Sequence, residues 1–85
     1  MSKNQTSPDE LVTEARKQML DGKEPKTYKD WALIMNFLAF NLERESCLIG
    51  CKLIRTLYNM PLSDDQVRSI VDYQQARKNG VKHAR

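Results

Sequence analysis

Histidine and glycine are scarce in this chain of 85 residues, which has one histidine and three glycines. His83 lies near the C-terminal end, in a segment that we expect to extend beyond the folded domain, so no histidine is expected to act as a base inside an ordered pocket. Gly22, Gly50 and Gly80 are too far apart to form a glycine-rich phosphate loop. Because no set of nucleophile, base and electrophile emerges from the other residues, we expect no enzymatic activity and no cofactor.

Cysteine is equally sparse: Cys47 and Cys51 lie in "RESCLIGCKLIRTL", residues 44–57. A structural metal site needs about four ligands, and redox pairs usually have two residues between the cysteines rather than three. On a helical wheel, both fall at the edge of an apolar sector formed by Ile49, Leu53, Ile54, Leu57 and Met60. We therefore predict small buried side chains, with reversible oxidation, and a metal site or a disulfide bond between subunits, as alternatives.

The sequence has no apolar run long enough to cross a membrane. Its most apolar stretch, "WALIMNFLAF" at residues 31–40, is shorter than the roughly 20 residues that a spanning helix requires. The first ten residues are polar and lack the apolar centre of a signal peptide. Two cysteines without an export signal are typical of a reducing compartment, so we expect a cytoplasmic protein.

Helix signals account for most of the chain, and alternating strand patterns are absent, so we predict an all-α fold. Ser7 is suited to cap a helix that starts at Pro8, and Glu10 completes a capping-box pattern. Gly22 is a plausible end signal. These signals predict a first helix over residues 8–20.

The central segment has no proline from residue 28 to residue 60, and Thr27 and Asp30 offer a second cap. Gly50 is its only glycine and need not end a helix. The polar run "ERES", residues 43–46, is the one candidate break, but Glu and Arg are good helix formers. We predict one long helix over residues 28–59, continuous or bent.

The last helix is predicted over residues 64–78, because Ser63 and Gln66 form a third capping pattern. The expected organisation is a flexible polar arm (1–6), a single helical domain (7–79) and a basic C-terminal tail (80–85). We expect the three helices to form a small bundle that is completed by dimerisation.

An excess of apolar residues marks the first half of the central segment. In residues 31–42 only Asn36 and Asn41 are polar, and a helix that is apolar all round must be covered on all sides. The monomer wraps this segment itself, or a second copy or a partner helix covers it. The side chains predicted to bind a partner are Leu33, Ile34, Phe37, Phe40, Ile54 and Tyr58.

Positive charge is concentrated at the C-terminal end, since residues 77–85 contain four basic side chains and no acid. The preceding residues hold ten Lys or Arg against eleven Asp or Glu, which does not favour a basic fold. A helix–turn–helix outline ends the chain, yet Asp64 and Asp65 begin its second helix, where phosphates would lie. For this nucleic-acid alternative, the candidate contacts are Arg68, Arg77, Lys78, Lys82 and Arg85.

These observations favour a small non-enzymatic regulatory or adaptor protein that binds a protein partner through an apolar face of the central helix. We expect a homodimer, and a phage- or plasmid-type inhibitor or modulator of a host protein is one form that such a regulator takes. A nucleic-acid-binding regulator that uses the last helix and the basic tail is the alternative.

Overall fold

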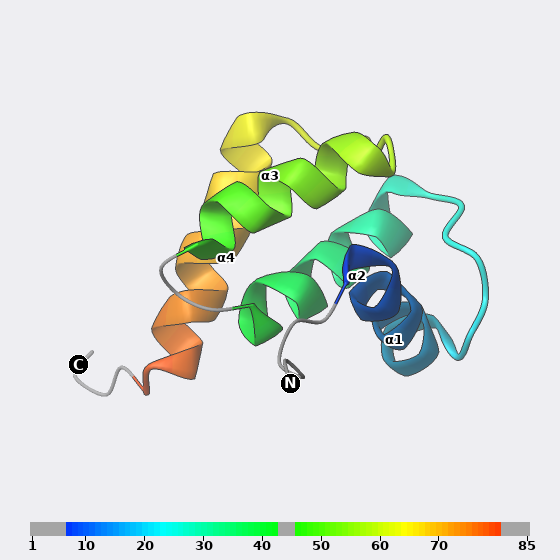
Figure 1. Cartoon of the computed structure of the whole chain (residues 1–85), viewed down its shortest axis with the longest axis horizontal. Coiled ribbons are helices and arrows are strands. Elements are labelled where there is room, and N and C mark those ends of the chain that lie inside the picture. Colours follow the sequence, from blue (N-terminus) through cyan, green and yellow to red (C-terminus); the bar gives the residue numbers. More distant parts are fainter. Residues whose placement is uncertain (1–6, 43–45, 81–85) are drawn as a thin grey trace.

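The computed structural model describes residues 7–42 and 46–80, and within these residues it contains four α-helices and no strand (Figure 1). The helices are α1 (Pro8–Leu20), α2 (Tyr28–Asn41), α3 (Cys47–Leu57) and α4 (Asp64–Lys78). The all-α prediction is therefore confirmed. The predicted arm and most of the predicted tail lie outside the described residues.

The prediction of one long helix over residues 28–59 is wrong. α2 ends at Asn41, Leu42 has extended backbone angles (φ −83°, ψ 159°), and α3 begins after Ser46. An unbroken helix of this length would measure about 48 Å, whereas the longest dimension of the molecule is 37 Å. α2 and α3 are therefore separate helices, and each buries an apolar face in one core.

Local capping explains where the helices start. Ser7 Oγ accepts a hydrogen bond from the Glu10 amide, as predicted for the start of α1. Complete capping boxes begin α2, at Thr27, and α4, at Ser63. α1 ends where Asp21 and Gly22 adopt positive φ angles, a conformation that glycine tolerates without strain.

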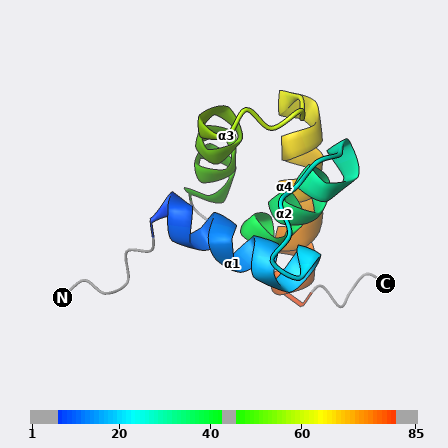
Figure 2. The ribbon, with the colours of Figure 1, turned by 90° about the vertical axis from the view of Figure 1, so that its right-hand side faces the viewer.

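α2 lies at the centre of the bundle. α1 and α4 pack extensively against it, and α3 packs against α4 and α2 (Figures 1 and 2). The core receives side chains from all four helices and from the turn between α3 and α4. Its buried members are Val12, Ala15, Ile34, Met35, Leu38, Ala39, Cys47, Cys51, Ile54, Met60, Leu62, Val67 and Val71.

Two polar side chains at the end of α3, Arg55 and Tyr58, link it to its neighbours. Arg55 donates a hydrogen bond to the Leu62 carbonyl (2.9 Å) and forms an ion pair with Asp64 at the start of α4. The Tyr58 hydroxyl donates to the Asp9 carboxylate of α1. These contacts fix the direction of α3, and with it the direction of the side chains that α3 leaves exposed.

Candidate protein-binding surface

A row of three large aliphatic side chains on α3 is exposed to solvent. Ile49, Leu53 and Leu57 are 72%, 54% and 58% exposed, respectively. Their spacing of four residues places them along one side of the helix. We call this row the α3 stripe. A small protein seldom leaves a contiguous apolar patch exposed without a binding role.

A different side of α3 enters the core. Cys47, Cys51 and Ile54 are buried there, and the Cys47 thiol donates a hydrogen bond to the Ala39 carbonyl of α2 (3.4 Å). A methyl group added at Gly50 would lie 3.4 Å from the Leu42 side chain, so α3 approaches the end of α2 closely. Small side chains permit this approach, while Ile49, Leu53 and Leu57 face outward.

The helical wheel predicts the three residues of the α3 stripe in the apolar sector of the central segment, but the six residues predicted to bind a partner do not include Ile49, Leu53 or Leu57. The sequence holds one signal for the buried side of α3, which is the row of small residues Cys47, Gly50 and Cys51. Small residues mark the face on which helices approach closely. Leu53 lies in the middle of the α3 stripe, so a substitution at Leu53 tests this surface most directly.

The two cysteines occupy the packing role that their wheel positions predicted. Both are free thiols in the core, and burial raises the pKa of Cys47 and of Cys51. A raised pKa keeps the thiol protonated near neutral pH, which lowers its reactivity. Within residues 7–42 and 46–80, no group of three or more His, Cys, Asp or Glu side chains is placed to hold a metal ion.

The six residues predicted to bind a partner do not form one surface. Ile34 and Ile54 are 0% and 3% exposed and belong to the core. Tyr58 is half-buried, and its hydrogen bond to Asp9 raises the pKa of its hydroxyl. Leu33 is also half-buried. Only Phe37 and Phe40 meet at one site, a groove on another side of the molecule.

This groove has a volume of about 430 Å³ and lies between α1, α2 and α4. The guanidinium group of Arg77 lies 5.7 Å from the centre of the Phe40 ring and 5.9 Å from that of the Tyr73 ring. We call this groove between α1, α2 and α4 the Arg77 groove. It is lined by Gln18, Met19, Asn36, Phe37, Phe40, Asn41, Gln74 and Arg77.

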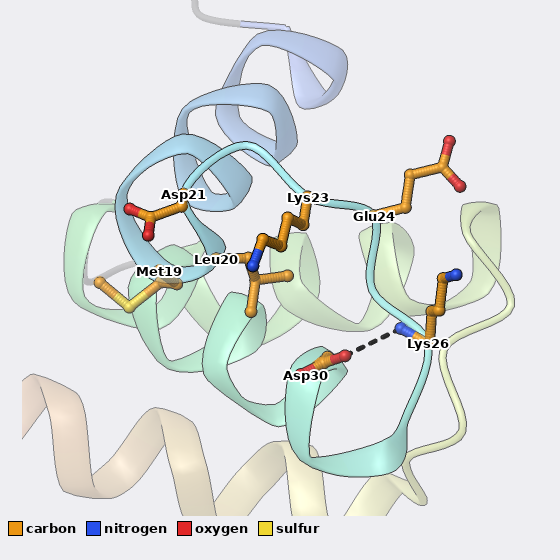
Figure 3. A pocket seen from close by; sticks show the side chains of 7 residues that line it. All are labelled: Met19, Leu20, Asp21, Lys23, Glu24, Lys26 and Asp30. Carbon is orange, nitrogen blue, oxygen red and sulfur yellow. Dashed lines mark hydrogen bonds between the residues drawn. The ribbon is translucent and has the colours of Figure 1, made fainter.

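A larger hollow of about 780 Å³ lies beside the connection between α1 and α2 (Figure 3). Its lining mixes acidic and basic side chains. The Asp30 carboxylate accepts hydrogen bonds from the backbone amides of Lys26 (2.9 Å) and Thr27 (3.3 Å), and the first of these contributes most to lowering its pKa. Because this carboxylate already caps α2, the hollow offers less to a ligand than the Arg77 groove does.

The basic residues predicted to contact nucleic acid are dispersed. Arg68 and Arg77 are nine residues apart on α4, which places them about 180° apart around the helix. The Lys78 ammonium donates to the Leu42 carbonyl (3.0 Å). Lys82 and Arg85 lie outside the described residues. The described part of α4 therefore presents no single basic face.

Comparisons with known proteins give no relative from which a function is transferable. No family model, no curated protein and no solved structure matches this chain. None of the helices in the described part of the chain is long and apolar enough to cross a lipid bilayer. The chemistry of the surface is therefore the basis for assigning a function.

Proposed function

We propose that this protein is a non-enzymatic regulator or adaptor that acts in the cytoplasm by binding a partner protein through the α3 stripe. The observation that carries the proposal is the exposure of three large aliphatic side chains in one row. Fully burying a leucine or isoleucine side chain contributes about 1.5–3 kcal/mol, and each residue of this row leaves more than half of its side chain available.

The geometry of the stripe favours a helical partner or a shallow apolar groove. From Ile49 to Leu57 the row extends about 12 Å along α3, and it forms a convex ridge. Such a ridge complements the groove between two helices or the apolar face of one. Stable interfaces use about 20–30 residues a side, so the stripe serves as the centre of a wider contact.

A second copy of this chain is one such partner, as the sequence analysis expected. In a two-fold arrangement with antiparallel α3 helices, Leu53 lies on the axis and Ile49 faces Leu57 of the partner subunit. Sedimentation analysis distinguishes this case, because a dimer that Leu53→Glu converts to a monomer identifies the second copy as the occupant.

The decisive experiment compares Leu53→Glu with Thr56→Glu, which adds the same charge at an exposed position of the same helix. Tagged proteins are used to recover partners from lysate of the source cells, with and without nuclease, and recovery is quantified by mass spectrometry. A partner that binds through the α3 stripe is recovered with the wild type and Thr56→Glu, and falls at least tenfold with Leu53→Glu.

Circular dichroism provides the control for folding, since both substitutions leave the core unchanged. Equal recovery of every partner with Leu53→Glu and with the wild type, together with an unchanged oligomeric state, would contradict the proposal. Recovery of nucleic acid, with protein partners lost on nuclease treatment, would favour the nucleic-acid alternative, which the dispersed basic residues of α4 otherwise support poorly.

A further inference from the structure

The Arg77 groove is separate from the α3 stripe, because no residue of α3 lines it. Its floor is apolar: Phe37 is half-buried, while Met19 and Phe40 are each more than one third exposed. Methionine is flexible and polarizable, which lets it adapt to different apolar groups. The groove therefore has room for a large apolar side chain of a ligand, and its floor offers apolar side chains for that group to contact.

The cation at its rim is held in place before any ligand arrives. Arg77 donates a hydrogen bond to the Gln74 side-chain oxygen (3.1 Å), and its guanidinium group lies over two aromatic rings. Gln74 is only 5% exposed and in turn donates to the Asn36 side chain (2.8 Å). Asn36 donates to the Ala32 carbonyl of α2 (2.8 Å). Because these hydrogen bonds already hold the Arg77 side chain, less conformational entropy is lost when a ligand binds to it.

The lining of the groove carries positive charge. Among the described residues, its lining contains the Arg77 cation, four neutral amides and no carboxylate. Glu14, one helical turn before Gln18, is engaged by Gln18 (2.6 Å) and by Lys17 (3.9 Å). A guanidinium group pairs with a carboxylate through two parallel hydrogen bonds, which makes a carboxylate the complementary ligand group.

We propose that the Arg77 groove is a second binding site, which takes a short segment of a partner protein that carries an aspartate or glutamate next to a large apolar side chain. The carboxylate pairs with Arg77, and the apolar side chain lies on Phe37, Phe40 and Met19. The exposed side-chain amides of Gln18 and Asn41 supply hydrogen bonds to the backbone of the segment. The groove volume, about 430 Å³, lies within the range of ligand pockets.

The test uses a phage-displayed library of random octapeptides selected on the full-length wild-type protein, with Arg77→Gln for counter-selection. The expected result is enrichment of peptides with Asp or Glu beside Leu, Ile, Phe or Trp. A synthetic enriched peptide should bind the wild type at least tenfold more tightly than it binds Arg77→Gln. Replacing its acid by the corresponding amide should give a similar loss.

Two further variants separate this site from other surfaces. Asn41→Asp, an exposed position in the lining, adds a carboxylate and should weaken binding of the acidic peptide. Arg68→Gln, on the other side of α4, and Leu53→Glu, in the α3 stripe, should leave peptide binding unchanged. Failure of the α3 stripe in its own test therefore does not affect this result.

Nuclear magnetic resonance titration locates the peptide. Shifts of the side-chain amides of Asn36 and Gln74 are expected. Selection of peptides without an acid, affinity that is the same in wild type and Arg77→Gln, or shifts confined to α3 would each overturn the proposal. So would displacement of the peptide by a micromolar thymidine oligonucleotide, which would assign the groove to nucleic acid.

Discussion

α2 and α3 follow one another along the chain and are both rich in apolar residues, yet only α2 is enclosed by other helices. Ile34, Met35, Leu38 and Ala39 of α2 are completely buried, because α1 and α4 cover two of its sides and α3 packs against it as well. α3 packs against α4 and α2 on one side and leaves Leu53 exposed on the other. The number of neighbouring helices, more than apolar content, decides how much of each helix stays exposed.

The two helices also differ in how they start. Thr27 and Asp30 form a complete capping box at α2, which is local and independent of the rest of the fold. Ser46 precedes α3 without a side-chain capping bond in the described structure. The start of α3 depends instead on tertiary packing, through the buried Cys47 and its hydrogen bond to Ala39.

The largest expected difference between the two helices comes from truncating matched leucines. Leu38→Ala removes a fully buried side chain and should lower the free energy of unfolding by about 3 kcal/mol. Leu53→Ala should change it by less than about 0.5 kcal/mol. Urea unfolding followed by circular dichroism measures both. A cost for Leu53→Ala as large as that for Leu38→Ala would show that the α3 stripe is covered in solution.

A smaller effect is expected from the helix starts. Thr27→Ala removes the capping bond to the Asp30 amide (3.1 Å) and should lower the free energy of unfolding by about 1 kcal/mol. Ser46→Ala should cost less than about 0.5 kcal/mol, because it removes no such bond. The same unfolding measurement compares them. An equal loss of unfolding free energy in Thr27→Ala and Ser46→Ala would mean that Ser46 caps α3 in solution.

The smallest effect should appear as a dependence of stability on pH. Hydrogen bonds from backbone amides lower the pKa of Asp30 at α2, and the hydrogen bond and charge of Arg55 lower that of Asp64, which connects α4 to α3. A folded pKa below the unfolded value, about 3.9, means that the ionised carboxylate stabilises the folded state. This stabilisation is present above about pH 4 and is lost as the pH falls through the folded pKa.

Unfolding free energies measured in urea from pH 7 to pH 2.5 test this dependence. Asp64→Asn should reduce the slope of unfolding free energy against pH in the acid range, because the ion pair with Arg55 is lost. Asp30→Asn should reduce the same slope, because the carboxylate that caps α2 is lost. An acid slope that neither substitution changes would assign the pH dependence to other carboxylates. Asp64 is exposed and Asp30 is half-buried, so added salt should reduce the contribution of Asp64 more than that of the backbone-bonded Asp30.

Particular elements show how far the sequence predicts this fold. The predicted ranges 8–20 and 64–78 coincide with α1 and α4, because Ser7 with Pro8, and Ser63 with Gln66, are local signals. The central helix was predicted wrongly because Glu and Arg in the run 43–46 have good helix propensity, and propensity is overridden by tertiary packing. The side chains of the Arg77 groove come from three helices, and no local pattern relates Phe40 to Arg77.

The sequence by itself determined the all-α fold class, the starts of three helices and the core role of the two cysteines, because capping and apolar spacing act within a few residues. Only the tertiary structure decided that α2 and α3 are separate, that the α3 stripe faces solvent and that Arg77 lies over Phe40. The physical reason is that burial depends on which neighbours cover a helix face. Those neighbours come from segments that are distant in the chain.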